Sequence, residues 1–335
     1  MNKPFENVAA TGAALRLNID GAHYLGLAAA PERIARRLSI AVSPRAYLPE
    51  IDDLRSDWVA SVAVPAFKLV RQRQGVQPAF CAIGTGVGLD ALSAIETLGA
   101  TRVGITDVHE EVVAAARANI LANLQPTHPV RVESGHGDLF EPLRDLRPRY
   151  DLIYENLPNI PIEDAERIAH ARTSSSHLPP RTEEIPALVR AQLLSLHYLA
   201  LQQAHDFLEP GGAVLSMLGS RIPLAVYEEM ARLAGHRGEI YTYGWKLQAD
   251  AEAVLQGHAA QQRAGYGPFH FYRAGHLADA FAGVDLATSG EQAHAIEARL
   301  APARLDPQQA WDALQRGEPI GHTFVVLRSR PERSA

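Results

Sequence analysis

A short glycine-rich turn constrains the fold of this chain more than any other sequence feature. The apolar run at residues 79–83 reads AFCAI and ends at Gly84, the first of three glycines spaced as Gly84-x-Gly86-x-Gly88. A buried strand that ends in such a turn brings a ligand close to backbone atoms, which requires residues without a side chain. The sequence therefore predicts a strand, a nucleotide-binding turn and a helix at residues 79–98.

A carboxylate follows the second predicted strand of this unit. Residues 102–106 form that strand, and Asp107 comes about 20 residues after the turn, where a carboxylate reaches the ribose hydroxyls of a nucleoside. The third glycine comes one residue earlier than in the dinucleotide fingerprint, so the turn alone fits either a ligand site or a purely structural turn. Asp107 in register favours a nucleoside ligand.

Composition and charge narrow the class of protein. The chain has 335 residues, 47% of them hydrophobic, which is sufficient for a sizeable core. Its net charge of −6 and its scattered Lys and Arg residues lack the basic footprint of a duplex-binding protein, so we expect a small-molecule substrate and no nucleic-acid partner. The single Cys81 fits a packing role in a reducing compartment. We expect a cytoplasmic protein with no membrane partner, and a homo-oligomer is compatible with the sequence.

The order of predicted elements indicates an α/β fold with a doubly wound sheet. Residues 1–77 are interpreted as a helical N-terminal cap, with a helix that begins at Pro31, and an extended connector at residues 41–50. Residues 78–335 form the main domain. Its further strands are predicted at residues 130–133, 150–154, 213–218, 239–245 and 322–327, and its helices include residues 89–98, 110–124 and 183–208. Residues 248–318 are too long for an ordinary connection and are interpreted as an inserted lid or substrate wall.

Three blocks of sequence resemble class I S-adenosylmethionine-dependent methyltransferases, and are similar to the family that methylates glutamine side chains of peptide release factors. The blocks are IGTGVG at residues 83–88, GDLFEPL at 137–143, and YDLIYENLPNIP at 150–161, which matches the segment around that family's Asn-Pro-Pro-Tyr motif. Residues 42–50 give a fainter fourth match. The resemblance implies a Rossmann-like mixed sheet with S-adenosylmethionine as cofactor.

The resemblance also implies roles for individual residues. The glycine turn would surround the methionine part of the cofactor, Asp107 would bind the ribose and Asp138 the adenine amine. Asn156 and the Leu157 carbonyl would face the substrate nitrogen, since an amide oxygen and a carbonyl can accept the two hydrogens of an –NH2 group. The implied cofactor-binding residues are Gly84, Thr85, Gly86, Gly88, Asp107, Val108, Asp138, Leu139 and Asn156. The implied catalytic residues are Glu155, Asn156, Leu157 and Pro158.

Departures from the family pattern bear on the substrate. Ala82 replaces an acidic residue, Leu157 replaces a proline, and Asn159 replaces an aromatic residue that stacks on a planar substrate group. Because Glu155 could pair with a guanidinium, we expect a small amino-acid-like acceptor, and favour a guanidino compound such as arginine. The expected substrate-contacting residues are Glu155, Asn159, Tyr243 and Trp245. The first two flank the motif, and the last two alternate on a strand, a pattern that equally fits core packing.

Other readings of the sequence remain open. A protein glutamine methyltransferase, a nucleic-acid amine methyltransferase and a non-catalytic nucleoside-binding module are the alternatives. The histidines have no trusted metal-ligand spacing, so no metal is expected and they are interpreted as surface or packing residues. These histidines are His170, His177, His197 and His205.

Overall fold

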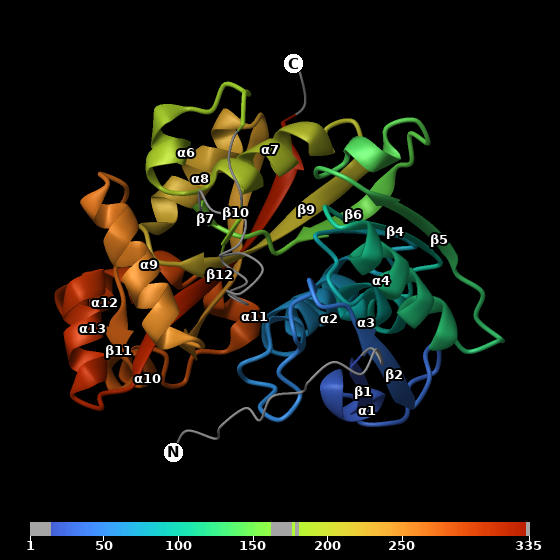
Figure 1. Cartoon of the computed structure of the whole chain (residues 1–335), viewed down its shortest axis with the longest axis horizontal. Helices are drawn as coiled ribbons and strands as arrows, with labels where there is room; N and C mark the ends of the chain where they lie inside the picture. The colour runs from blue at the N-terminus through green and yellow to red at the C-terminus, as the bar shows by residue number, and fades with distance from the viewer. Residues whose placement is uncertain (1–14, 162–175, 178–180, 333–335) are drawn as a thin grey trace.

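A central β-sheet, flanked by helices on both faces, organises the chain in the computed structural model, which describes residues 15–161, 176–177 and 181–332 (Figure 1). The strands in spatial order are β10 (His236–Leu247), β12 (Ile320–Pro331), β9 (Leu208–Ser220), β6 (Tyr150–Glu155), β3 (Ala79–Ile83), β4 (Arg102–Asp107) and β5 (Arg131–His136), with the short β11 (Tyr272–Arg273) paired to β12. Strands β5, β4, β3, β6 and β9 are parallel, and β12 runs antiparallel between β9 and β10. The strand order reverses between β3 and β6, as in a doubly wound fold, so the predicted Rossmann-like mixed sheet is confirmed.

Both faces of the sheet are buried, and this explains the continuous apolar run of β3. Cys81 and Ile83 pack in one hydrophobic cluster with residues of α7 (Ser195–Ala204) and α8 (Leu224–Leu233). Phe80 and Ala82 pack in a second cluster on the opposite face. That face is covered by α2 (Val64–Gln74), α3 (Leu89–Thr97) and α4 (Glu110–Ala122). Figure 1 shows these two groups of helices on opposite sides of the strands.

The N-terminal region contains a β-hairpin, and the predicted helical cap is wrong for this part of the chain. β1 (Leu15–Asp20) pairs antiparallel with β2 (Arg37–Val42), and the four-residue α1 (Gly21–Tyr24) lies between them. No helix begins at Pro31, because Leu38, Ile40 and Val42 alternate along β2 and bury one strand face in the core. A π-helix (Val59–Ala63) leads into α2, so apart from the single turn of α1 the helices described before β3 begin at Val59. Residues 1–14 lie outside the described part.

Helix α4 completes the hydrogen bonding of the outer edge of β2 through two asparagine side chains. Asn119 accepts a hydrogen bond from the Ala41 amide (2.9 Å) and donates to the Ala41 carbonyl (2.8 Å). Asn123 makes the same pair of bonds with Ser39, at 2.9 and 3.1 Å. The hairpin also shares the second hydrophobic cluster with β3, β4 and β6, so it packs directly against the main sheet. The division of the chain at residue 77 stays a prediction.

The long helix predicted at residues 183–208 is two helices. α6 (Ala187–Ala191) ends before Leu193, whose φ of +58° lies in the left-handed region that interrupts a helix, and α7 begins at Ser195. The break matters for the site, because the Leu193 carbonyl accepts a hydrogen bond from the Asn159 side chain at 3.2 Å.

The segment between β10 and β12 is mostly helical, as predicted. It contains α9 (Ala251–Arg263), α10 (Ala274–Ala280), α11 (Leu286–Ser289), α12 (Ala293–Leu300), a 3-10 turn (Ala301–Ala303) and α13 (Pro307–Gln315). Short elements elsewhere are a 3-10 turn (Glu141–Leu143), β7 (Ile160–Pro161) and β8 (Ser176–His177). The role of residues 248–318 as a lid or substrate wall stays a prediction. In the described ranges, none of the helices has the length and apolar character needed to cross a membrane.

Candidate functional site

The carboxyl ends of β3 and β4 bring the glycine turn and Asp107 into direct contact. One carboxylate oxygen of Asp107 accepts a hydrogen bond from the Gly86 amide at 3.3 Å, and the other accepts one from the His109 amide at 3.2 Å. Burial raises the pKa of Asp107, while these two amides favour its ionised form. The carboxylate therefore ties the turn to the next strand at the edge where doubly wound sheets bind ligands.

Two glycines of the turn serve different purposes. A Cβ atom on Gly86 (φ +54°) would meet no atom within 4 Å, so the backbone there borders open space that a ligand can approach. A Cβ on Gly88 (φ +85°) would lie 3.1 Å from the Ala116 carbonyl, so this glycine lets α3 pack closely against α4. The open space above Gly86 fits the nucleoside cofactor that the sequence predicts.

The Thr85 side chain points into the protein rather than toward a ligand. Its hydroxyl donates a hydrogen bond to Asp90 at 2.8 Å, and both residues are buried. Burial raises the pKa of Asp90 to about 7. Any contact from Thr85 to a cofactor would therefore come from its backbone.

The residues expected around the adenine are spread between surface and core. Val108 is 60% exposed beside Asp107, and Leu139 is buried with φ +48°. Asp138 forms a two-point ion pair with Arg181, at 3.1 and 2.6 Å, and burial nevertheless raises its pKa. Arg181 lies 43 residues away in the chain, in no motif, so sequence reasoning missed it.

Glu155, which the sequence suggested as a partner for a guanidinium, is bonded to groups of the chain itself. Its side chain is 0% exposed, and both oxygens lie within 2.9 Å of His197 Nδ1. One oxygen also accepts a hydrogen bond from the Leu157 amide at 3.2 Å. His197 Nε2 in turn lies 3.1 Å from the Asn159 side-chain nitrogen. The three side chains thus form a chain of hydrogen bonds in which Glu155 and His197 are buried and Asn159 is partly buried.

His197 was interpreted from sequence as an ordinary packing residue, and this chain of bonds gives it a specific role. No spacing rule could have found it, because it lies 42 residues from Glu155 on a different element. His205 bonds the Ala234 carbonyl at 2.9 Å, as a packing residue would. His170 and the side chain of His177 fall outside the described residues. Within the described ranges, no three His, Cys, Asp or Glu side chains cluster as metal ligands do.

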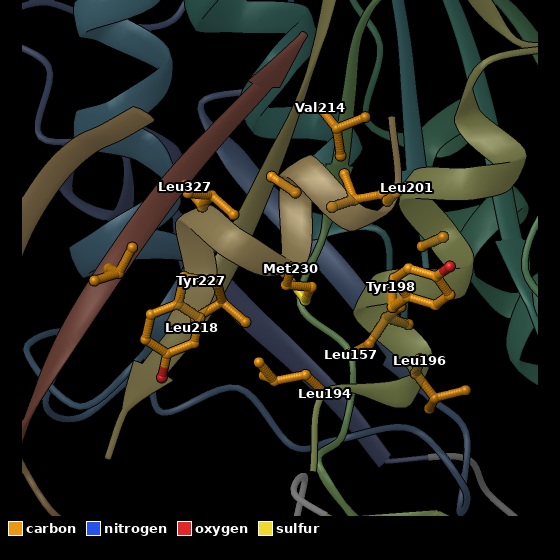
Figure 2. Packing of buried hydrophobic residues seen from close by; sticks show 14 of the residues in the cluster. Leu157, Leu194, Leu196, Tyr198, Leu201, Val214, Leu218, Tyr227, Met230 and Leu327 are labelled. Atoms are coloured by element: carbon orange, nitrogen blue, oxygen red, sulfur yellow. The ribbon is translucent and has the colours of Figure 1, made fainter. Parts of the chain in front are cut away.

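Leu157 anchors the motif between the core and the glycine turn. Its side chain belongs to the hydrophobic cluster beside Leu194, Leu196 and Tyr198 (Figure 2). One of its methyl groups lies 3.3 Å from the position that a Cβ of Gly84 would occupy. The motif on β6 and the turn on β3 are therefore neighbours at the point where the strand order reverses.

A cavity opens beside the motif, on the side of Asn156. Asn156, Leu157 and Asn159 line it, whereas Pro158 does not. Side chains from distant parts of the chain complete the wall. They include Tyr47 and Trp58 from the connector region, Arg221 after β9, Lys246 and Gln248 at the end of β10, Asp250, and His322 on β12. The glycine turn and Asp107 are not part of this wall, so the cavity and the expected cofactor site adjoin at Leu157.

Tyr243 and Trp245, which the sequence suggested as substrate contacts, do not line this cavity. Tyr243 is buried in the hydrophobic cluster with α8 and α12, and Trp245 packs against the same cluster. Lys246, the next residue on β10, points to the cavity instead, because side chains alternate across a strand. The strand prediction was right, but the sequence did not reveal which strand face meets the cavity.

No family model matches the sequence. The release factor glutamine methyltransferase of Streptomyces coelicolor is 26% identical over 198 residues, which are 58% of this chain and 64% of that relative, so less than two thirds of the relative is spanned.

Solved structures matched by the chain include the following methyltransferases. The ribosomal protein L11 methylase from Lactobacillus delbrueckii subsp. bulgaricus is 18% identical, with a TM-score of 0.34, over 57% of this chain and 72% of that one. A methyltransferase from Pyrococcus furiosus is 19% identical, with a TM-score of 0.36, over 60% and 80% of the two chains.

Three independent features now agree. The sheet reverses its order between β3 and β6, the glycine turn carries Asp107 in register, and the curated relative matches over more than half of the chain. The chain is thus similar to S-adenosylmethionine-dependent methyltransferases in its mixed sheet and in its match to the curated relative.

Proposed function

We propose that the protein is an S-adenosylmethionine-dependent N-methyltransferase whose acceptor nitrogen binds at Asn156 and the Leu157 carbonyl. The observation that carries the proposal is the closeness of Leu157 to Gly84. The Leu157 Cδ2 atom lies 3.3 Å from the position that a Cβ on Gly84 would occupy. It places the acceptor motif directly beside the turn expected to hold the methyl donor. When bound, the cofactor supplies a methyl group on a sulfonium.

The chain's own contribution to this reaction is positioning. The Asn156 side-chain oxygen and the Leu157 carbonyl accept the two hydrogens of an –NH2 group and leave its lone pair free. Glu155 fixes the Leu157 amide, and His197 fixes Glu155, so the carbonyl and amide of the motif are held from behind. Asn159 is tied to His197 and to the Leu193 carbonyl, which limits its freedom to act as a stacking replacement.

The acceptor is a small polar amino-acid-like molecule in this proposal. A guanidino group is no longer favoured, because the carboxylate that was to pair with it is buried and already bonded. A second candidate is a glutamine side chain on a protein, which the similarity to a release factor glutamine methyltransferase favours. A nucleic-acid amine is disfavoured by the net charge of −6.

Two measurements test the proposal. Titration calorimetry should detect binding of S-adenosylmethionine and of its demethylated product, and a screen with labelled methyl donor should locate the methyl on a nitrogen. Asn156→Ala should keep most of the affinity for the demethylated product and lose turnover, because its contact is to the acceptor. Binding of a nicotinamide dinucleotide with no response to S-adenosylmethionine would contradict the assignment.

A further inference from the structure

We propose that the cavity beside Asn156 binds an anionic group of the acceptor, a carboxylate or a phosphate, through Arg221 and His322. The inference rests on the proposed function, since it assigns the charge of the substrate of that same site. An anionic group on the acceptor thus replaces the guanidinium cation that was expected from the sequence.

Arg221 is a buried cation without a counter-charge. It is 8% exposed and lines the cavity. Its guanidinium donates to neutral oxygens, the Gln248 side chain at 2.7 Å and the Gly219 carbonyl at 3.4 Å, and its Nε has no partner. Among the described residues, no carboxylate lies within ion-pair distance of it. Because a buried unpaired charge is costly, such an arrangement favours an anion from outside the chain.

His322 offers a second unsatisfied group to the same cavity. It is 2% exposed, and neither ring nitrogen has a hydrogen-bond partner. Its ring stacks on Trp58, with centroids 6.1 Å apart, which fixes its orientation. Burial, together with the charges of Arg221 and Lys246, holds its pKa well below the ordinary value, so the imidazole is neutral and one ring nitrogen carries a hydrogen to donate.

Lys246 adds a positive charge beside His322. The two residues are direct cross-strand partners of β10 and β12. The Lys246 ammonium is held by the Ser61 hydroxyl at 2.8 Å and by two backbone carbonyls, of Ser56 and Asp57. The carboxylate among the described lining residues, that of Asp250, is exposed. The carboxylates of Asp57 and Asp53 lie near Lys246 but do not line the cavity, so Arg221 is the buried lining cation without a nearby carboxylate among the described residues. Asn156 lines the same cavity.

The first experiment measures anion binding without relying on turnover. Protein saturated with S-adenosylhomocysteine is titrated with acetate, inorganic phosphate and the neutral analogue acetamide, and the ring nitrogens of His322 are followed by NMR. We expect the His322 signals to respond to an anion and not to acetamide. Arg221→Met should weaken anion binding at least tenfold, and Arg221→Lys, which keeps the charge, should weaken it less. Arg237→Met, an exposed arginine on β10, is the matched control and should bind as the parent does.

Other outcomes would overturn the proposal. If neither anion moves the His322 signals, or if acetamide moves them equally, the cavity does not select an anion. If Arg221→Met also weakens S-adenosylhomocysteine binding tenfold, the anion is the carboxylate of the cofactor and not part of the acceptor. The same titrations are repeated without S-adenosylhomocysteine, so that anion binding is measured independently of the proposed function. If the parent protein does not bind S-adenosylhomocysteine, the proposed function is refuted, whatever the anion titrations show.

Discussion

Asp107 connects two parts of the ligand-binding edge, because its oxygens bond the Gly86 and His109 amides. An aspartate-to-asparagine change keeps one acceptor oxygen and the size of the side chain but removes the charge. Any loss of ligand affinity in that variant therefore reports on the charge together with the lost bond to one of the two amides.

We predict that Asp107→Asn binds S-adenosylhomocysteine roughly ten- to a hundredfold more weakly, since a hydrogen bond to a charged group contributes about 1.5–3 kcal/mol. Titration calorimetry measures the change. Asp145→Asn, the same change at an exposed aspartate, is the control. Equal affinity in Asp107→Asn and the parent protein would remove Asp107 from the cofactor site.

Asp90 in α3, which accepts a hydrogen bond from Thr85 of the glycine turn, gives a pH dependence. The carboxyl of Asp90 titrates near 3.8 when free, and burial raises its pKa to about 7 in the folded protein. Between these values the folded state binds more protons than the unfolded state, so the free energy of unfolding contributed by this group falls as pH rises. Above about pH 7 the contribution is constant.

Asp90→Asn should therefore remove this dependence. From pH 5 to pH 8 we expect the parent protein to lose about 1–3 kcal/mol more unfolding free energy than the variant, since one pKa unit corresponds to about 1.4 kcal/mol. Urea unfolding of both proteins at the two pH values measures the difference. Parallel losses in both would show that Asp90 is ionised in the folded state at pH 5.

At the scale of elements, the pairing of α4 with β2 is set by side chains rather than by a neighbouring strand. Asn119 also donates to the Val87 carbonyl at 3.0 Å, so one buried amide joins α4, β2 and the glycine turn itself. Its removal would leave both peptide groups of Ala41 without these partners.

We expect Asn119→Ala to lower the free energy of unfolding by about 2–3 kcal/mol, because buried peptide groups lose their partners. Arg117→Ala, on the exposed side of the same helix, should change it by about 0.5 kcal/mol or less. Chemical denaturation of the two variants makes the comparison. A similar small change in both would mean that water replaces the amide without cost.

The elements that sequence predicted well are those whose pattern is local. β3, β4 and β6 are apolar runs because parallel strands are buried on both faces, and the turns that follow them carry their own glycine or asparagine signals. The N-terminal hairpin was missed, because LRLNID is half polar and its partner strand is supported by asparagines about 80 residues away. The burial of Glu155 was missed for the same reason, since it depends on His197. Sequence alone therefore located the motif but not the direction in which its neighbours point.

For the whole molecule, the cavity joins residues from Tyr47 to His322 and so depends on contacts across most of the chain. The Lys246 ammonium lies 5.0 Å from the centre of the Trp58 ring, and this contact links the connector before the main sheet to its sixth strand in chain order. Burial lowers the pKa of Lys246 to about 8, so the ammonium is charged at pH 7.

A double-mutant cycle of Trp58→Ala and Lys246→Met should give a coupling energy of about 0.5–2 kcal/mol at pH 7, as expected of a partly buried cation–π contact. The coupling should decrease well above pH 8, where the amine is neutral. Unfolding free energies of the four proteins supply the cycle. Trp58→Ala with Arg237→Met is the control pair, and its two changes in unfolding free energy should add. A coupling energy of zero in the test pair would mean that the ring and the ammonium do not interact.

The position of β12 has a consequence for the order of events during synthesis. It is made after β9 and β10 yet lies between them, about 70 residues of chain after β10 ends. At about 5–20 residues per second, a ribosome leaves the facing edges of β9 and β10 without their middle strand for several seconds. His322 arrives with that strand, so this wall of the cavity is the part of the site that a growing chain assembles last.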